Sequence, residues 1–184
     1  MLWIANGATR QRIEDTFDLF GAHIDMATTF RGSEVTLALS WLNNLADSDS
    51  IQTAIKQPDR LAREVPGTAL HASITSHPCT FTVEHVTALL DFSAADLGNG
   101  HERPTATSLE LDYNTTLLGK SATMALARQQ SSDAAMLELP RTRWLAAASI
   151  ALDSHSTIGI EYRRDRQYSG QRTNQSLLKL STIF

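Results

Sequence analysis

Hydrophobic and polar residues alternate along most of this chain, with a period of two rather than 3.6. The clearest stretch is 105–118, in which Leu109, Leu111 and Tyr113 alternate with Glu110 and Asp112. A period of two places successive side chains on opposite faces of a β-strand. Stretches of this kind recur with little helical spacing between them and predict about ten strands. We therefore expect an all-β fold, an antiparallel up-and-down meander that forms a transmembrane β-barrel or a partial barrel.

The stretch 175–184 carries the alternation to the last residue of the sequence. Leu178, Leu180 and Phe184 point to one side of the expected strand, and Lys179 points to the other. An aromatic residue at the end of a strand is typical of the interfacial girdle of an outer-membrane barrel. We expect this strand to close the barrel, and Phe184 to act as the assembly signal that the barrel-assembly machinery reads.

Short turns and long polar connections alternate between the expected strands. The short turns lie at Arg31, His77, Gly119 and Ser154, and the long connections begin near Asn43, Ser93, Gln130 and Ser169. In a barrel that crosses the outer membrane, the periplasmic turns are short and the extracellular loops are long. The last strand then runs toward the periplasm. Within the first long connection, helical spacing at residues 51–55 predicts a short helix.

The composition fits a single β-barrel domain over residues 1–184. Of these residues, 42% are hydrophobic and 20% are charged, which argues against a disordered chain. The mean hydropathy is −0.20 and no run of about 18 apolar residues occurs, so the sequence excludes a transmembrane helix. Barrel strands need no such run, because their residues alternate. The net charge of −4 argues against a nucleic-acid partner.

The sequence carries no motif of an enzyme or of a cofactor site. It lacks a phosphate-binding glycine-rich loop, a GxSxG elbow, an HExxH helix and paired cysteines, since Cys79 is its single cysteine. His71 and His85 would face each other if the turn between them centres on Pro78, and a facing pair can bind a metal. The alternative is an ordinary polar pair, or a register shifted by one residue. We expect no catalysis, no cofactor and no metal site.

Charged residues that alternate with apolar ones form the candidate functional site. In a barrel they would line the substrate path, and they are Glu110, Asp112, Glu161, Arg163, Asp165 and Lys179. Opposite charges across a narrow aqueous lumen can select solutes by charge and shape. Alternatively, they neutralise one another as salt bridges and fill the lumen. The alternation does not reveal which side faces inward, and a soluble barrel or sandwich that binds a small ligand would turn its apolar side inward.

The opposite side of the expected strands would contact lipid. Arg164 and Arg166 fall on this side near the long connections, where they would meet anionic headgroups or simply be solvated at a strand end. Aromatic residues lie mostly near strand ends, as the interfacial belt of a membrane protein requires. They are Trp3, Trp41, Trp144, Tyr113, Tyr162, Tyr168 and Phe184.

The first residues, MLWIANGATRQRIEDTF, do not have the pattern of a secretory signal peptide, which an outer-membrane protein needs. Leu2, Trp3 and Ile4 look like the end of a strand that is entered midway. We therefore expect an N-terminally truncated chain, with an open or strained edge at 175–184.

Several segments between residues 17 and 184 combine loop and strand patterns in a recognisable order. They include WLNNLADSDSIQTAI, FTVEHVTALLDFSAADL and, most specifically, AAMLELPRTRW followed by the final hairpin. Together they resemble the C-terminal part of an LbtU-type siderophore porin. The resemblance implies an unplugged channel of the bacterial outer membrane that takes up an iron–siderophore complex or another small solute. An outer-membrane barrel without transport is the alternative. The chain departs from the family in its shorter length and in Thr182, where a bulky or aromatic residue is usual.

Overall fold

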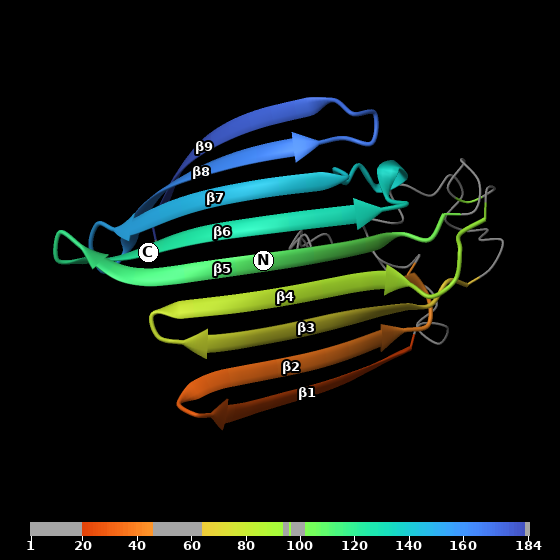
Figure 1. Ribbon diagram of the computed structural model, residues 1–184, viewed down its shortest axis with the longest axis horizontal. Helices are drawn as coiled ribbons and strands as arrows, with labels where there is room; N and C mark the ends of the chain where they lie inside the picture. The colour runs from red at the N-terminus through yellow and green to blue at the C-terminus, as the bar shows by residue number, and fades with distance from the viewer. Residues whose placement is uncertain (1–19, 46–63, 94–95, 97–101, 183–184) are drawn as a thin grey trace.

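A nine-stranded antiparallel meander makes up the sheet in the computed structural model. The structure describes residues 20–45, 64–93, 96 and 102–182, and each strand pairs with the next one along the chain (Figure 1). The strands are β1 (Gly21–Phe30), β2 (Ser33–Leu42), β3 (Gly67–Ser76), β4 (Cys79–Ala88), β5 (Thr105–Leu117), β6 (Lys120–Ser132), β7 (Thr142–Ala151), β8 (Ser156–Arg166) and β9 (Arg172–Thr182). The prediction of an all-β meander is confirmed. The expected strand end at residues 2–4 and the expected helix at 51–55 lie outside the described residues.

The short turns lie at one end of the sheet and the longer connections at the other. Turns at 31–32, 77–78, 118–119 and 152–155 alternate with connections at 43–66, 89–104, 133–141 and 167–171, as the sequence predicts. Arg31 and Gly32 have φ angles of 51° and 81°, and Leu118 and Gly119 have 53° and 75°. Positive φ at both central residues is the type I′ geometry, whose twist matches that of the flanking strands. These two turns therefore fix the register of their hairpins.

A carboxylate holds the turn between β7 and β8. Asp153 Oδ1 accepts hydrogen bonds from the backbone N–H groups of His155 and Ser156, at 2.7 and 2.8 Å. These bonds, first the one from His155, lower the pKa of Asp153, and the nearby Lys120 lowers it further. Asp153 and His155 thus serve a turn, where Asx-type bonding to the backbone is common.

The register divides the strand side chains into two faces, because directly opposed residues project to the same side of a sheet. One row crosses β1 to β5 as Met26, Leu37, Ala72, Val83 and Leu109. We call this side the apolar face. Its large apolar members are Ile24, Met26, Phe30, Val35, Leu37, Leu39, Trp41, Leu70, Ile74, Phe81, Val83, Leu109, Leu111, Tyr113, Leu117, Met124, Leu126, Trp144, Ile150, Ile158, Ile160, Tyr162, Leu178 and Leu180. The residues between them form the polar face.

Exposure of the two faces is opposite to that in a soluble sandwich. On the apolar face, Leu111, Leu126 and Ile160 are 46%, 51% and 58% exposed. On the polar face, Ala127 and Asp165 are only 3% and 8% exposed. A soluble β-sheet buries its apolar side and leaves its polar side in water. In the interior strands β2 to β8 the polar side is therefore the more sheltered one, whereas both sides of the edge strands β1 and β9 are exposed.

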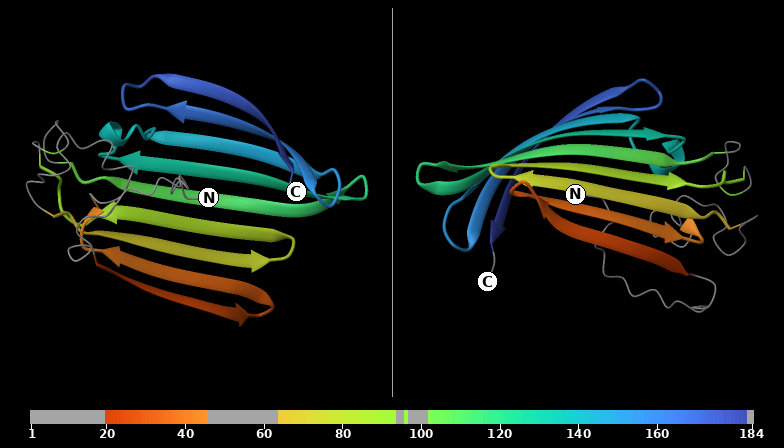
Figure 2. Two further views of the ribbon diagram at one scale, coloured as in Figure 1. Left: turned by 180° about the vertical axis from the view of Figure 1, so that it is seen from behind. Right: turned by 60° about the horizontal axis from the view of Figure 1, so that its bottom comes forward.

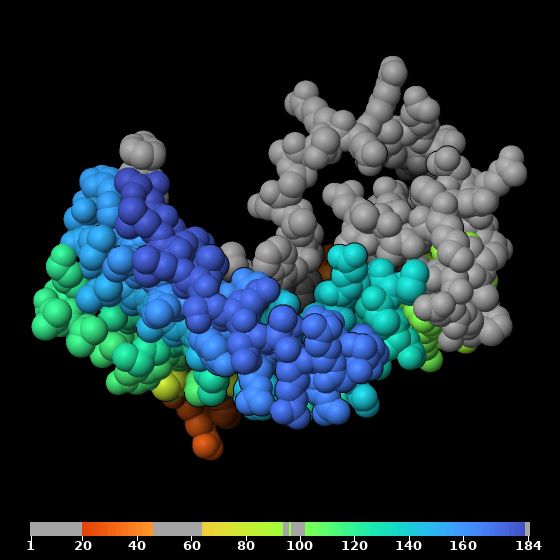
Figure 3. Space-filling model, turned by 90° about the horizontal axis from the view of Figure 1, so that it is seen from above, coloured from red at the N-terminus to blue at the C-terminus, as the bar shows by residue number. Residues whose placement is uncertain are grey.

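Only a small apolar core occurs among the described residues, and it lies beyond the strand ends. Val65, Ala88 and Phe92 are buried together on the side of the long connections, with Leu45 and Met136 packed against them. The curved and twisted sheet itself encloses no such core (Figure 2), and the turn ends of β8 and β9 rise out of the plane of their neighbours (Figure 3). The described residues include no helix that is both long and apolar enough to cross a membrane.

Both edges of the sheet are open among the described residues. Within this part of the chain, β1 pairs only with β2, and β9 pairs only with β8. The expected open edge at 175–184 is therefore present for the described residues of β9. Both edge strands run from the long connections toward the short turns (Figure 1), so direct closure would pair them in parallel. Antiparallel closure requires at least one further strand between β9 and β1.

His71 and His85 do not face each other, and the register shifted by one residue, which the sequence left as an alternative, is the one present. The turn consists of His77 and Pro78 together, so the closing pair is Ser76 with Cys79 and the register differs by one residue from a turn centred on Pro78. His71 lies opposite Glu84, whereas His85 lies opposite Leu70. Because a one-residue shift moves a side chain to the other face, the two histidines are on opposite sides of the sheet.

The turn at Asp153 gives a pH prediction. A carboxylate whose pKa is lowered on folding stabilises the folded turn above its ordinary pKa, and this stabilisation is lost as the pH falls through the lowered value. We expect the amide proton shifts of His155 and Ser156, measured by NMR in detergent micelles, to titrate with a midpoint below 3.8, the ordinary value for Asp. Asp153→Asn keeps the acceptor oxygen but cannot titrate, so it should remove the transition. A midpoint above 3.8 would contradict the assignment.

Candidate functional site

All six charged residues that the sequence singles out lie on the polar face. Glu110 and Asp112 come from β5, Lys179 comes from β9, and Glu161, Arg163 and Asp165 come from β8. The structure does not bring all of them together. Glu110 and Arg163 share one row across the sheet, but Ala127 and Leu145 lie between them. Three strand spacings separate the two charges by about 14 Å.

A bidentate ion pair on the polar face includes a residue that the sequence did not single out. Arg143 on β7 lies directly opposite Asp165 on β8. Its Nε and one terminal nitrogen donate to the two carboxylate oxygens of Asp165, each at 2.8 Å. The two side chains are 17% and 11% exposed. A bidentate guanidinium–carboxylate pair of this kind is among the strongest side-chain contacts, since both charges are satisfied in a fixed geometry.

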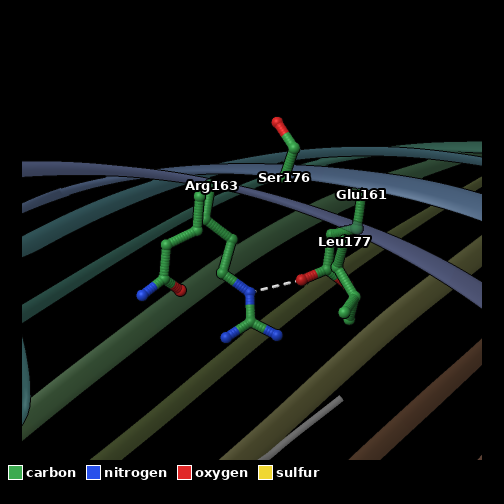
Figure 4. A pocket seen from close by; sticks show the side chains of 5 residues that line it. Glu161, Arg163, Ser176 and Leu177 are labelled. Carbon is green, nitrogen blue, oxygen red and sulfur yellow. Dashed lines mark hydrogen bonds and ion pairs between the residues drawn. The ribbon is translucent and has the colours of Figure 1, made fainter.

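A second pair borders an open hollow at the free edge of the sheet. Arg163 Nε donates to Glu161 Oε1 from two positions along the same strand. Gln175, Ser176 and Leu177 of β9 complete the lining of a hollow of about 400 Å³. Figure 4 shows Arg163, Glu161 and Leu177 extending from one side of the sheet and Ser176 from the other. The hollow therefore opens mainly on the polar face.

Polar contacts continue across the first four strands on the same face. His71 Nδ1 lies 3.3 Å from Glu84 Oε1, and His23 Nε2 lies 3.6 Å from Asp25 Oδ1. His23 Nδ1 also contacts Ser40 Oγ at 2.8 Å. Metal ions in proteins usually take three or more such ligands. No group of three or more His, Cys, Asp or Glu side chains with suitable spacing occurs in the described part of the chain.

Acidic residues are confined to the polar face. Every Asp and Glu of the nine strands lies there: Asp25, Glu34, Glu84, Glu110, Asp112, Glu161 and Asp165. The basic residues of the strands are divided between the two faces. Arg143, Arg163 and Lys179 are on the polar face, and Lys120, Arg128, Arg164, Arg166 and Arg172 are on the apolar face. The polar face can therefore present a mixed field to a solute, whereas the apolar face presents only positive charge.

The connections at the long end are tied to one another. The Tyr168 hydroxyl contacts Ser131 Oγ at 2.9 Å and accepts a hydrogen bond from the Ala134 N–H at 3.3 Å. Ser131 Oγ also contacts the Pro140 carbonyl at 2.8 Å. These bonds fasten the connection after β8 to the one after β6. Tyr168, which the sequence assigned to an aromatic belt, thus anchors two connections.

A carboxyl group with an altered pKa lies at the same end. Glu102 forms an isolated antiparallel bridge with Phe92 beyond β4 and β5. Partial burial raises the pKa of Glu102, and the negative charge of Asp133 raises it further. The protonated form is therefore favoured at this position more than in water.

Aromatic residues occupy both ends of the described strands. Trp41 and Trp144 lie toward the long connections, and Trp41 packs against Phe20 with ring centroids 5.4 Å apart. Tyr113 lies toward the short turns. Tyr162, by contrast, lies in the middle of β8. Trp3 and Phe184, which the sequence assigned to the same belt, lie outside the described residues.

Comparison with known proteins gives distant relatives. The chain is 27% identical over 136 residues to a UPF0422 protein of Coxiella burnetii, which covers 72% of this chain and 29% of that protein. It is 28% identical over 108 residues to the UPF0422 protein lpp3030 of Legionella pneumophila strain Paris, covering 58% of this chain and 20% of that protein. The chain thus spans less than a third of the length of these relatives. No family model and no solved structure matches it.

The pair between Arg143 and Asp165 gives a stability prediction. Replacing Arg143 with Met leaves a sheltered carboxylate without its partner, which typically costs about 3 kcal/mol or more of unfolding free energy. The double variant Arg143→Met with Asp165→Leu removes both charges and should recover most of this loss. Urea unfolding in detergent micelles, followed by tryptophan fluorescence, measures both. Equal losses in the single and double variants would show that the pair contributes packing rather than charge compensation.

Proposed function

We propose that this chain forms part of the wall of a β-barrel in the bacterial outer membrane. The observation that carries the proposal is the exposure of the two faces: many leucine, isoleucine and aromatic side chains are exposed, while in the interior strands the charged side chains of the polar face other than Glu34 are sheltered. An exposed apolar surface that extends over nine strands is far larger than soluble proteins tolerate without a partner. Lipid is a partner of matching chemistry and extent. The apolar face would contact outer-membrane lipid, and the polar face would line the interior.

The function that we propose for such a barrel is the uptake of a small solute through a porin-like channel. The solute would pass between the long connections and then along the charged polar face, without a covalent step. Acidic and basic groups there, such as Asp112 and Arg143, offer contacts to polar solutes that carry either positive or negative charge. The proposal of an iron–siderophore complex as the solute rests on the sequence resemblance to LbtU-type porins.

The open edges limit how the wall can be completed. β9 and β1 both lack a second partner in the described sheet, and they run in the same direction. We propose that further strands complete the barrel, supplied by a longer polypeptide such as the relatives have or by another chain. The barrel-assembly machinery would act on the last strand, and Phe184 would serve as its signal.

A structural barrel without transport is the second candidate, and a specific observation favours it. Charged side chains of the polar face are paired with each other: Arg143 with Asp165, Arg163 with Glu161, and His71 with Glu84. Side chains that satisfy one another fill an interior and leave little for a solute to bind. A soluble ligand-binding barrel, the third possibility, would need the apolar face to be enclosed.

Membrane insertion is the first measurement. We expect the completed barrel that contains this chain to be extracted from outer membranes by detergent only, and to migrate differently on a denaturing gel before and after heating, because intact barrels resist the detergent. A monomer that stays in aqueous solution without detergent would refute both membrane candidates.

Solute flux separates the channel from the structural barrel. Liposomes that contain the protein should swell in small neutral sugars, with rates that fall as solute size increases. For ions, Asp112→Lys on the polar face should shift the reversal potential toward anion preference, because it replaces a negative charge beside the path with a positive one. Glu138→Lys, on the connection between β6 and β7, makes the same change in charge outside the sheet and should shift it less. If no solute of any size passes, the channel is refuted and the structural barrel remains.

A further inference from the structure

The apolar face carries a cluster of positive charge that the proposed channel does not use. Four arginines lie near the long-connection end of β6, β8 and β9, and they are Arg128, Arg164, Arg166 and Arg172. We call them the arginine cluster. All four are exposed. They lie on the side of the sheet that otherwise presents leucine, isoleucine and aromatic side chains.

The register brings the four side chains into two neighbouring rows. Arg166 lies directly opposite Arg172, so their Cβ atoms are about 5 Å apart. Arg164 lies two positions before Arg166 on β8, on the same face and about 7 Å away. Arg128 shares the row of Arg164, with Trp144 between them, and its guanidinium lies 5.6 Å from the centre of the Trp144 ring.

The cluster lacks a counter-charge on its own face. No Asp or Glu of the nine strands projects from the apolar face, and the ion pairs among the described residues involve none of the four arginines. The contrast within β8 is direct. Arg163 on the polar face pairs with Glu161, whereas Arg164, the next residue, projects into the arginine cluster. Like charges at this spacing repel each other, so an external anion would stabilise them.

Three features indicate the chemistry of that anion. Guanidinium groups bind phosphate oxygens through two parallel hydrogen bonds, which makes arginine the preferred residue for phosphate recognition. Trp144 stands beside the cluster, and tryptophan concentrates at the level of lipid headgroups. Below the cluster, toward the short turns, Leu126, Ile160 and Tyr162 continue the exposed apolar surface. Phosphate groups directly above hydrocarbon are what a phosphorylated lipid presents.

We propose that the arginine cluster binds the phosphate groups of an anionic lipid in the membrane leaflet on the side of the long connections. The inference rests on the proposed membrane orientation of the sheet. The opposite end of the apolar face differs. There, Lys120 is the one basic strand residue on this face, and its Nζ donates to the Leu152 carbonyl. The chain therefore discriminates between the two leaflets by charge.

The test compares binding to two kinds of vesicle. Detergent-solubilised chain is diluted into vesicles of phosphatidylcholine alone, or of phosphatidylcholine with a phosphorylated glycolipid (lipid A), and binding is measured by flotation. We expect stronger binding to the vesicles with lipid A. Arg164→Gln with Arg166→Gln should reduce that preference about 25-fold, since each basic residue at an anionic surface contributes roughly a fivefold increase in affinity. The matched double variant Arg31→Gln with Lys120→Gln removes two cations from the short-turn end and should reduce it less than threefold.

Each other outcome has a defined meaning. Wild-type chain that binds neither kind of vesicle refutes the membrane orientation, and with it the proposed function. Equal binding to both kinds leaves the membrane orientation standing and overturns the lipid site. Equal losses in the two double variants also overturn it, because net charge would then explain the preference. If millimolar pyrophosphate abolishes the preference, the cluster is a site for a soluble phosphate compound and the lipid source is wrong. Binding of each variant to neutral vesicles shows that it has folded.

Discussion

Strand register is the constraint on which every property of this sheet depends. Because side chains alternate with a period of two, a slip by one residue would exchange the apolar and polar faces of a whole strand. The chain fixes its register at the hairpin turns. Positive φ angles at Arg31–Gly32 and Leu118–Gly119 allow tight type I′ turns, and Asp153 accepts two backbone hydrogen bonds in a third turn. Turn chemistry that involves few atoms thereby sets which side chains share a face in three of the hairpins.

The two faces make different demands on their surroundings. Several charged groups on the polar face are paired within the sheet, most completely where Arg143 donates hydrogen bonds to both carboxylate oxygens of Asp165. The apolar face has no such compensation within the described sheet, because its exposed leucine and isoleucine side chains can be removed from water only by a partner outside that sheet. The edges add a second demand. Unpaired backbone groups along β1 and β9 each cost several kcal/mol in hydrocarbon, so a lipid environment requires that these edges be paired. Exposure of the apolar face and closure of the sheet are thus linked.

Alternation and turn residues were enough to predict most of the fold. The strands, the alternating short and long connections, and the common face of Glu110, Asp112, Glu161, Arg163, Asp165 and Lys179 follow from a period of two counted along each strand. Features that depend on the pairing of two strands were harder to predict from the sequence. The sequence left two registers open for His71 and His85, because it does not show whether the turn centres on Pro78 or consists of His77 and Pro78. Arg143 was overlooked, although its position before the outward Trp144 assigns it to the polar face; its pairing with Asp165 needs the register of two strands.

The alternation along a single strand cannot predict two further properties, the sheltered face and the arginine cluster. Which face is sheltered depends on the curvature of the sheet, and alternation is the same for either answer. The cluster of Arg128, Arg164, Arg166 and Arg172 also draws on three strands that are separated in sequence. The register of β6 to β9 assembles it, and the sequence alone indicated only that Arg164 and Arg166 share a side.

The distance between the cations at the two ends of the apolar face can be compared with the thickness of the apolar band of outer-membrane barrels. On β6, Lys120 marks the short-turn end and Arg128 the other, with Ala122, Met124 and Leu126 between them on that face. Eight residues at about 3.4 Å each span about 27 Å. A strand tilted by about 40° would reduce this to about 21 Å along the membrane normal, close to the apolar band of about 25 Å that outer-membrane barrels present. Lysine and arginine side chains reach beyond their own Cα atoms toward water and headgroups, which makes up the difference.

A cation at mid-membrane depth costs about 2–4 kcal/mol of stability, but a cation at the interface costs almost nothing. The described strands place every apolar-face cation toward a strand end, where that cost would be smallest if this face contacted lipid.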